Sequence, residues 1–98
     1  MASKEEESAK NEEKFREIVR STIHVNISLF KYVDPEIVSD SILETFLPFI
    51  KTIVDAELMI VQELKHLSEV YYNRNNWHKF AIISLCLEKL NKIDVITP

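Results

Sequence analysis

The sequence contains no glycine, and its only prolines are Pro35, Pro48 and Pro98. Glycine is the usual residue where the backbone needs a positive φ, as in tight β-hairpins, β-bulges and phosphate-binding loops. Its absence excludes Walker loops, dinucleotide-binding fingerprints and nucleophile elbows, which depend on glycine. We therefore expect an all-α fold, either a four-helix bundle or a pair of αα-hairpins, with no β-sheet. No motif in the chain names an activity.

Cysteine and long apolar runs are also scarce. The one cysteine, Cys86, cannot form an internal disulfide and lies in the apolar run 80–87, which favours a small core residue over a reactive or partner-bonded thiol. No apolar run approaches the ~20 residues that span a bilayer. The charged residues 1–14 lack the apolar centre of a secretory signal. We expect a cytoplasmic protein that does not enter the membrane.

Basic residues are the minority charge. Twelve Lys and Arg face sixteen Asp and Glu, a formal net charge of −4, which argues against broad nucleic-acid binding. His24, His66 and His78 lie far apart and outside zinc-ligand spacing, so we expect no metal and no cofactor. Glu57 interrupts an apolar stripe. It is either a partly buried carboxylate with a raised pKa or, as we favour, a side chain that reaches solvent or pairs with a lysine.

The apolar periodicity divides the chain into a charged tail, 1–10, which we predict to be flexible, and a single all-α domain, 11–98. The predicted helices are 11–31, 35–46, 48–73 and 76–93. The stripe of the first helix comprises Phe15, Ile18, Val19, Thr22, Asn26, Leu29, Phe30 and Val33. Within it, Asn26 is interpreted as a buried amide that finds a hydrogen-bond partner and sets the helix register, rather than as a ligand-binding group.

The boundaries of the second helix rest on two prolines. Asp34, Pro35 and Glu36 form a start signal of capping carboxylate, N1 proline and first-turn acid. The apolar period then continues past Pro48, but an unbroken helix over 35–72 would be about 57 Å long, too long for a compact domain of this size. The break lies either at 45–48 or at 55–57. The strong helix formers in 56–59 favour the first.

The segment 73–76, Asn-Arg-Asn-Asn, turns the chain without glycine because asparagine tolerates left-handed backbone. The last two helices thus form an αα-hairpin. With Tyr71, Tyr72, Trp77, Phe80 and Leu87, residues 64–90 resemble one tetratricopeptide-type hairpin. A single hairpin is fewer than the three repeats that such arrays need.

The same turn carries Arg74 and His78 in the run Arg-Asn-Asn-Trp-His. This resembles the Arg-Asn…His motif of HEPN-type ribonucleases, all-α domains with a composite RNA-cleaving site from two protomers. The resemblance implies that Arg74 holds a phosphate and His78 handles the proton. Three residues separate the two, fewer than in that family, so we expect no enzyme and assign no catalytic residue.

The positive charge near the C-terminus makes single-stranded nucleic acid a candidate partner. Residues 71–98 hold four basic and two acidic side chains, a balance of 4 − 2 = +2. Aromatic and basic side chains together grip single-stranded nucleic acid. The residues for such a contact are Tyr72, Arg74, Trp77, His78 and Lys79.

The last helix favours a different function. Its centre is apolar almost all the way round, and a helix in a four-helix domain keeps an outer face, so we expect one side to lack intramolecular cover. The sequence therefore predicts a small intracellular protein-interaction or adaptor module, which binds a second copy or another helical protein. The predicted interface residues are Phe80, Ile82, Ile83, Cys86 and Leu87.

Overall fold

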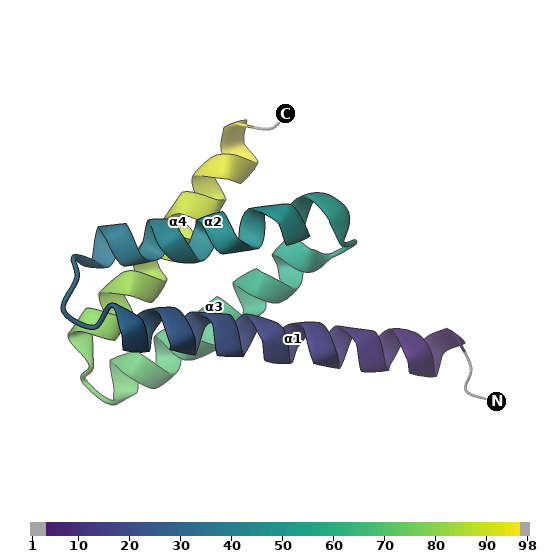
Figure 1. The fold of residues 1–98 in the computed structure, drawn as a ribbon, viewed down its shortest axis with the longest axis horizontal. Coiled ribbons are helices and arrows are strands. Elements are labelled where there is room, and N and C mark those ends of the chain that lie inside the picture. Colours follow the sequence, from purple (N-terminus) through teal and green to yellow (C-terminus); the bar gives the residue numbers. More distant parts are fainter. Residues whose placement is uncertain (1–3, 97–98) are drawn as a thin grey trace.

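A computed structural model describes the backbone of residues 4–96 and the side chains of residues 10–91. Over the described backbone the chain forms four helices and no strand: α1 (Lys4–Leu29), α2 (Pro35–Thr52), α3 (Ala56–Asn73) and α4 (Trp77–Ile96). The predicted all-α fold is confirmed. Figure 1 shows α1 and α2 as one antiparallel hairpin lying across a second hairpin, α3 and α4. Both α1 and α4 pack chiefly on α2 and α3.

All four helices contribute to one core. The α1 side chains in it recur every four residues, and α4 supplies several of the most deeply buried groups. Each fully buried aliphatic or aromatic side chain stabilises the fold by roughly 1.5–3 kcal/mol. The principal members are Phe15, Val19, Ile23, Ile27, Val38, Ile42, Phe46, Met59, Ile60, Leu64, Leu67, Ile82, Ile83, Cys86 and Leu90.

The predicted start of α2 is confirmed. Asp34 Oδ1 accepts the backbone N–H of Glu36 at 2.9 Å, and Pro35 occupies the first helical position. Proline is suited to that position because its φ is already helical and its missing N–H has no partner there.

The predicted break at 45–48 is wrong. α2 continues through Pro48 to Thr52, and the chain turns at 53–55, which includes Asp55 of the other candidate, 55–57. Thr45 does not cap a new helix, because its hydroxyl donates to the Ser41 carbonyl at 3.0 Å within α2. Asp55 makes the turn, with a left-handed φ of 61°, in the role that glycine usually takes. Glu57 is half-buried in the first turn of α3.

The predicted start of the first helix is also wrong. α1 begins at Lys4, so residues 4–10, expected as a flexible tail, are helical. Lysine, glutamate and alanine make up six of its seven residues, and all three are strong helix formers. The last helix starts one residue later and ends three residues later than predicted.

Polar contacts fix how the helices sit on one another. Half-buried Asn26 accepts from the Ser41 hydroxyl at 3.1 Å, a bond that joins α1 to α2. Its amide also donates to the Thr22 carbonyl at 2.8 Å within α1. Glu63 of α3, almost buried, pairs with Arg20 at 3.1 Å and Arg16 at 3.8 Å. A polar group that needs a specific partner penalises other helix registers.

Candidate interaction surfaces

The residues expected to form an interface on α4 are mostly internal. Ile82, Ile83 and Cys86 have no exposed surface, because α4 lies against α2 and α3 together and these two helices cover its apolar sides. Phe80 and Leu87 are partly buried and pack against the same core. The expectation that α4 lacks intramolecular cover is therefore wrong for Ile82, Ile83 and Cys86, which are unavailable to a partner in the folded chain.

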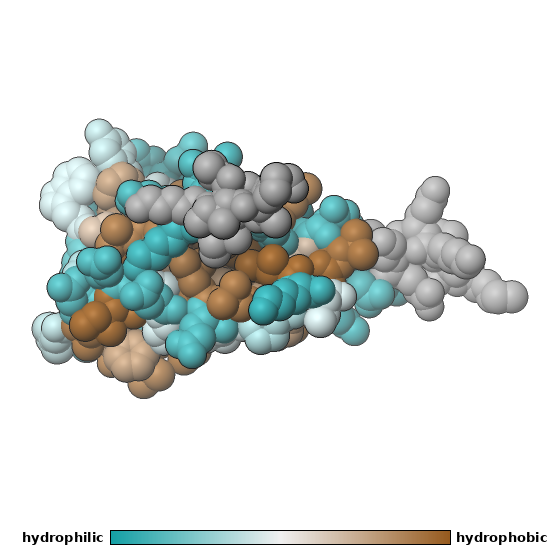
Figure 2. All heavy atoms as spheres, turned by 90° about the horizontal axis from the view of Figure 1, so that it is seen from above, coloured by the Kyte–Doolittle hydropathy of each residue, from teal (hydrophilic) through white to brown (hydrophobic). Residues whose placement is uncertain are grey.

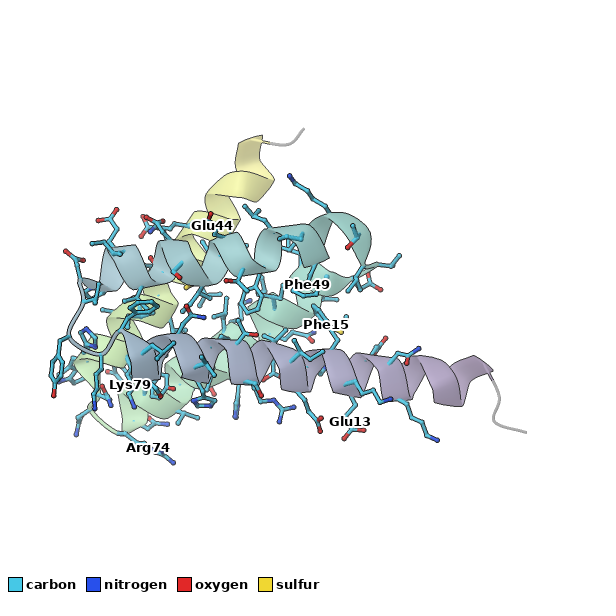
Figure 3. The ribbon with its side chains drawn as sticks, viewed as in Figure 1. Glu13, Phe15, Glu44, Phe49, Arg74 and Lys79 are labelled. Carbon is cyan, nitrogen blue, oxygen red and sulfur yellow. The ribbon has the colours of Figure 1, made fainter. Side chains whose placement is uncertain are left out.

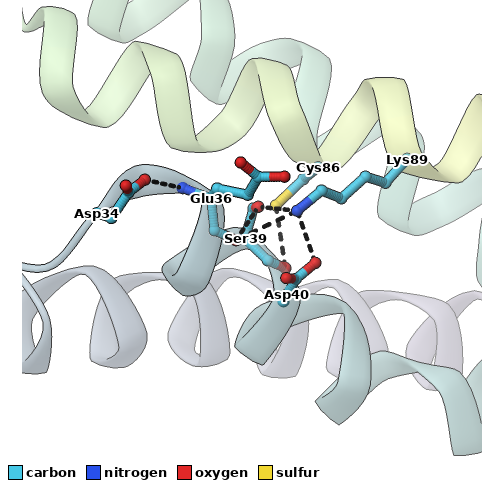
Figure 4. A network of polar contacts seen from close by, with 6 residues as sticks. All are labelled: Asp34, Glu36, Ser39, Asp40, Cys86 and Lys89. Atoms are coloured by element: carbon cyan, nitrogen blue, oxygen red, sulfur yellow. Dashed lines mark hydrogen bonds and ion pairs between the residues drawn. The ribbon is translucent and has the colours of Figure 1, made fainter.

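A polar network beside Cys86 holds α4 to α2 (Figure 4). Lys89 Nζ donates to Asp40 Oδ1 at 2.6 Å, to Ser39 Oγ at 2.7 Å and to the Glu36 carbonyl at 3.2 Å. Buried Ser39 itself donates to the Glu36 carbonyl at 2.7 Å. Burial raises the pKa of the Cys86 thiol to about 12, although nearby Lys89 lowers it. The thiol is therefore protonated at neutral pH, as befits a core residue.

Three aromatic rings meet where α3 passes into α4, and we call Tyr72, Trp77 and Phe80 the aromatic end. The Tyr72 ring centroid lies 5.5 Å from both Trp77 and Phe80, and the Trp77 and Phe80 centroids lie 6.1 Å apart. Two of these contacts are edge-on and the Tyr72–Phe80 contact is tilted, and together they restrict the orientations of the rings. Tyr72 is 56% exposed and Trp77 55% exposed, so each presents ring surface to solvent.

Two cationic side chains lie near the aromatic end, and Figure 3 shows Arg74 and Lys79 together at this end of the molecule. Lys79 Nζ lies 5.6 Å from the Tyr71 ring centroid. His78 Nε2 lies 3.2 Å from the Val33 carbonyl, which brings the α1–α2 loop against the start of α4. The five residues predicted for nucleic-acid contact, Tyr72, Arg74, Trp77, His78 and Lys79, all lie at the α3–α4 turn; the Tyr72 and Trp77 rings contact each other, whereas Lys79 contacts Tyr71 and His78 contacts the α1–α2 loop. This contact occupies Nε2 of His78. The ribonuclease resemblance implies that the His78 ring handles a proton, and Nε2 is one of the two ring nitrogens that could do so.

A surface that the sequence analysis missed lies on the outer side of α1. We call Ile18, Thr22, Val25 and Leu29 the α1 stripe. Ile18 is 49% exposed, Val25 54% and Leu29 71%, and Thr22 is half-buried. Spacings of four, three and four residues are those of a coiled-coil seam. The apolar stripe predicted from the sequence included Ile18, Thr22 and Leu29 together with core residues. In the structure the core residues of α1 recur every four residues, and these three lie outside that row.

The α1 stripe continues onto the start of α2. Ser41 lies level with Asn26 because they share a hydrogen bond, and α2 runs antiparallel to α1. Ile37, one turn before Ser41 and 61% exposed, therefore lies near the end of the stripe, where Leu29 and Phe30 are also exposed. Figure 2 shows apolar side chains reaching the surface between hydrophilic ones on the face seen from above.

Among the described residues, no group of three or more His, Cys, Asp or Glu side chains is placed to hold a metal ion. Within the same part of the chain, none of the helices combines the length and apolar character needed to cross a bilayer.

The chain matches no protein-family model, no curated protein and no solved structure.

Proposed function

We propose that this protein is a helical protein-interaction module that associates with a second copy of itself through the α1 stripe. The observation that carries the proposal is a row of three exposed apolar side chains and one half-buried threonine, with coiled-coil spacing, on the side of α1 that faces away from the core. A helix normally buries one apolar stripe, and a second one left in water favours association. The proposal assigns no catalytic residue and no cofactor.

The spacing of the α1 stripe suits a second copy in the antiparallel direction. Spacings of four, three and four are the same in both directions, so a two-fold axis between Thr22 and Val25 superimposes the stripe on itself. Ile18 of one copy then lies opposite Leu29 of the other, and Thr22 lies opposite Val25. In the antiparallel pair each Thr22 faces a Val25, so every facing pair of residues includes an apolar side chain. In a parallel pair the two Thr22 side chains would face each other.

Side chains beside the stripe support the same direction. Ser21 and Ser28 flank it on the solvent side, and small residues allow two helices to approach closely. Glu17 lies next to Ile18 at one end, and Lys31 follows Leu29 at the other. Lys31 lies in the turn just after α1, so an antiparallel pair brings the end of each copy that carries Glu17 toward the end of its partner from which Lys31 follows.

The exposed fractions set the expected affinity. Full burial of an aliphatic side chain gains roughly 1.5–3 kcal/mol, and Ile18, Val25 and Leu29 are still 49%, 54% and 71% exposed. Across two copies the gain is of the same order as the ~4–15 kcal/mol that association costs in lost freedom. We therefore expect a dimer with a dissociation constant of roughly micromolar to millimolar size.

The test is the oligomeric state by analytical ultracentrifugation from about 10 μM to about 1 mM. We expect a concentration-dependent dimer, and we expect Val25→Asp to be a folded monomer, because Val25 is outside the core. Leu58→Asp is the matched control: Leu58 is equally exposed but lies on α3, so this variant should still dimerise. A monomeric natural protein, or a dimeric Val25→Asp, would refute the proposal.

A charge exchange tests the direction of pairing. Glu17→Lys should weaken the dimer because it places two cations together at each end. Adding Lys31→Glu to that variant should restore the affinity. If the double variant dimerises no more tightly than Glu17→Lys, antiparallel pairing is contradicted, whereas dimer formation itself is not.

A further inference from the structure

A different surface, the aromatic end, has a chemistry that the α1 stripe lacks. Tyr72, Trp77 and Phe80 contact one another through two edge contacts and one tilted contact, with centroids 5.5 to 6.1 Å apart. Tyr72 and Trp77 are each more than half exposed, and their ring contacts restrict the orientation of both rings. Rings that are already oriented lose little conformational freedom when a flat group stacks on them.

The segment that carries these rings is positive although the chain as a whole is negative. Residues 72–80 hold two cations, Arg74 and Lys79, and no Asp or Glu. Lys79 Nζ lies over the ring of Tyr71, the residue before Tyr72. The contact between His78 and the Val33 carbonyl places the α1–α2 loop against the same segment.

We propose that the aromatic end binds single-stranded nucleic acid, with bases stacked on Tyr72 and Trp77 and phosphates paired with Arg74 and Lys79. Every base has an aromatic face and every nucleotide a phosphate, so alternating rings and cations suit this ligand without regard to its sequence. In a duplex the base faces are already stacked on one another. An acidic peptide would satisfy the cations and leave the exposed rings without partners.

Trp77 allows the stacking to be observed directly, because it is the only tryptophan in the chain. A thymidine oligonucleotide of about 12 nucleotides, titrated at low salt, should quench the Trp77 fluorescence saturably. The absence of saturable quenching would overturn the proposal. So would equal or tighter binding of the matched duplex, of poly-glutamate or of vesicles of phosphatidylserine and phosphatidylcholine.

Substitutions locate the site, with affinity measured by the anisotropy of a labelled oligonucleotide. Tyr72→Ala and Trp77→Ala should each weaken binding roughly tenfold, as loss of one stacked base does. Arg74→Ala should weaken binding and reduce the slope of log affinity against log salt by about 0.7, the value for one phosphate contact. The controls Lys51→Ala and Leu58→Ala change exposed residues outside segments 31–34 and 72–80 and should bind normally.

Circular dichroism must show native helix content in each variant. Unchanged affinity in Tyr72→Ala and Arg74→Ala, or the same loss in the two controls, would overturn the assignment. The folded monomer expected for Val25→Asp should bind the oligonucleotide like the natural protein, so this result does not depend on dimer formation.

Discussion

Lys89 offers a direct measure of what holds α4 to α2. Its ammonium group donates to Asp40, Ser39 and the Glu36 carbonyl. The substitution Lys89→Met keeps most of the aliphatic stem and removes all three donations. The stem can still cover apolar surface, so the change isolates the polar contribution.

The three contacts should contribute unequally. The Asp40 side chain is 67% exposed, so its ion pair contributes only about 0–1 kcal/mol. Ser39 is fully buried, and a hydrogen bond from a charged donor to such a group contributes roughly 1.5–3 kcal/mol. Ser39 still donates to the Glu36 carbonyl after the substitution, which reduces the loss. We expect Lys89→Met to lower the free energy of unfolding by about 1–2 kcal/mol.

Urea denaturation followed by circular dichroism measures this difference, and thermal melting checks it, at about 4–8 °C per kcal/mol for a domain of this size. Asp40→Asn should cost under ~1 kcal/mol. Lys65→Met, at an exposed position of α3, is the matched control and should change little. If Lys89→Met is no more destabilising than Asp40→Asn or Lys65→Met, the reasoning is wrong and the network contributes nothing measurable.

Three further predictions follow from burial and backbone geometry. Ile82→Asp should abolish the cooperative unfolding transition, because Ile82 has no exposed surface and an unpaired buried charge costs several kcal/mol; a folded variant would contradict the internal position of α4. Cys86 should react with a thiol reagent at about pH 8 only after unfolding. Because folding raises the pKa of Cys86 from 9.0 to about 12, the thiol ionises more readily in the unfolded chain, and the free energy of unfolding should fall as pH rises from about 9 to about 12. Cys86→Ala should lack this pH dependence, and a pH profile of stability identical to that of the natural protein would refute the prediction. Pro48→Ala should raise the melting temperature by restoring an N–H within α2, and a lower melting temperature would show that the helix needs the proline.

Several features followed from neighbouring residues and were predictable for that reason. The start of α2 depends on Asp34, Pro35 and Glu36, which act within one helical turn. The 73–76 turn depends on asparagine, and Asn75 does take a positive φ of 56°. The aromatic and basic residues of the candidate nucleic-acid surface were predicted together because a short turn keeps them together.

The predictions of the helix break at 45–48 and of the interface on α4 were wrong because both features depend on packing between helices that are distant in the sequence. Pro48 is accepted inside α2 because it lies on the exposed side, while Phe46 on the same helix is fully buried in the core. Burial of that kind can offset the hydrogen bond that a proline removes. Nothing within one turn of Pro48 distinguishes this outcome from a break.

The sequence by itself determined the all-α class, the cap of α2 and the glycine-free turn at 73–76, because these depend on local backbone preferences and on hydrogen bonds between near neighbours. Only the tertiary structure decided that α4 is covered on both sides and that α1 carries two apolar stripes, one in the core and one in water. Apolar periodicity shows which side chains avoid water. It does not show which helix covers them, because that depends on how four helices pack around one core.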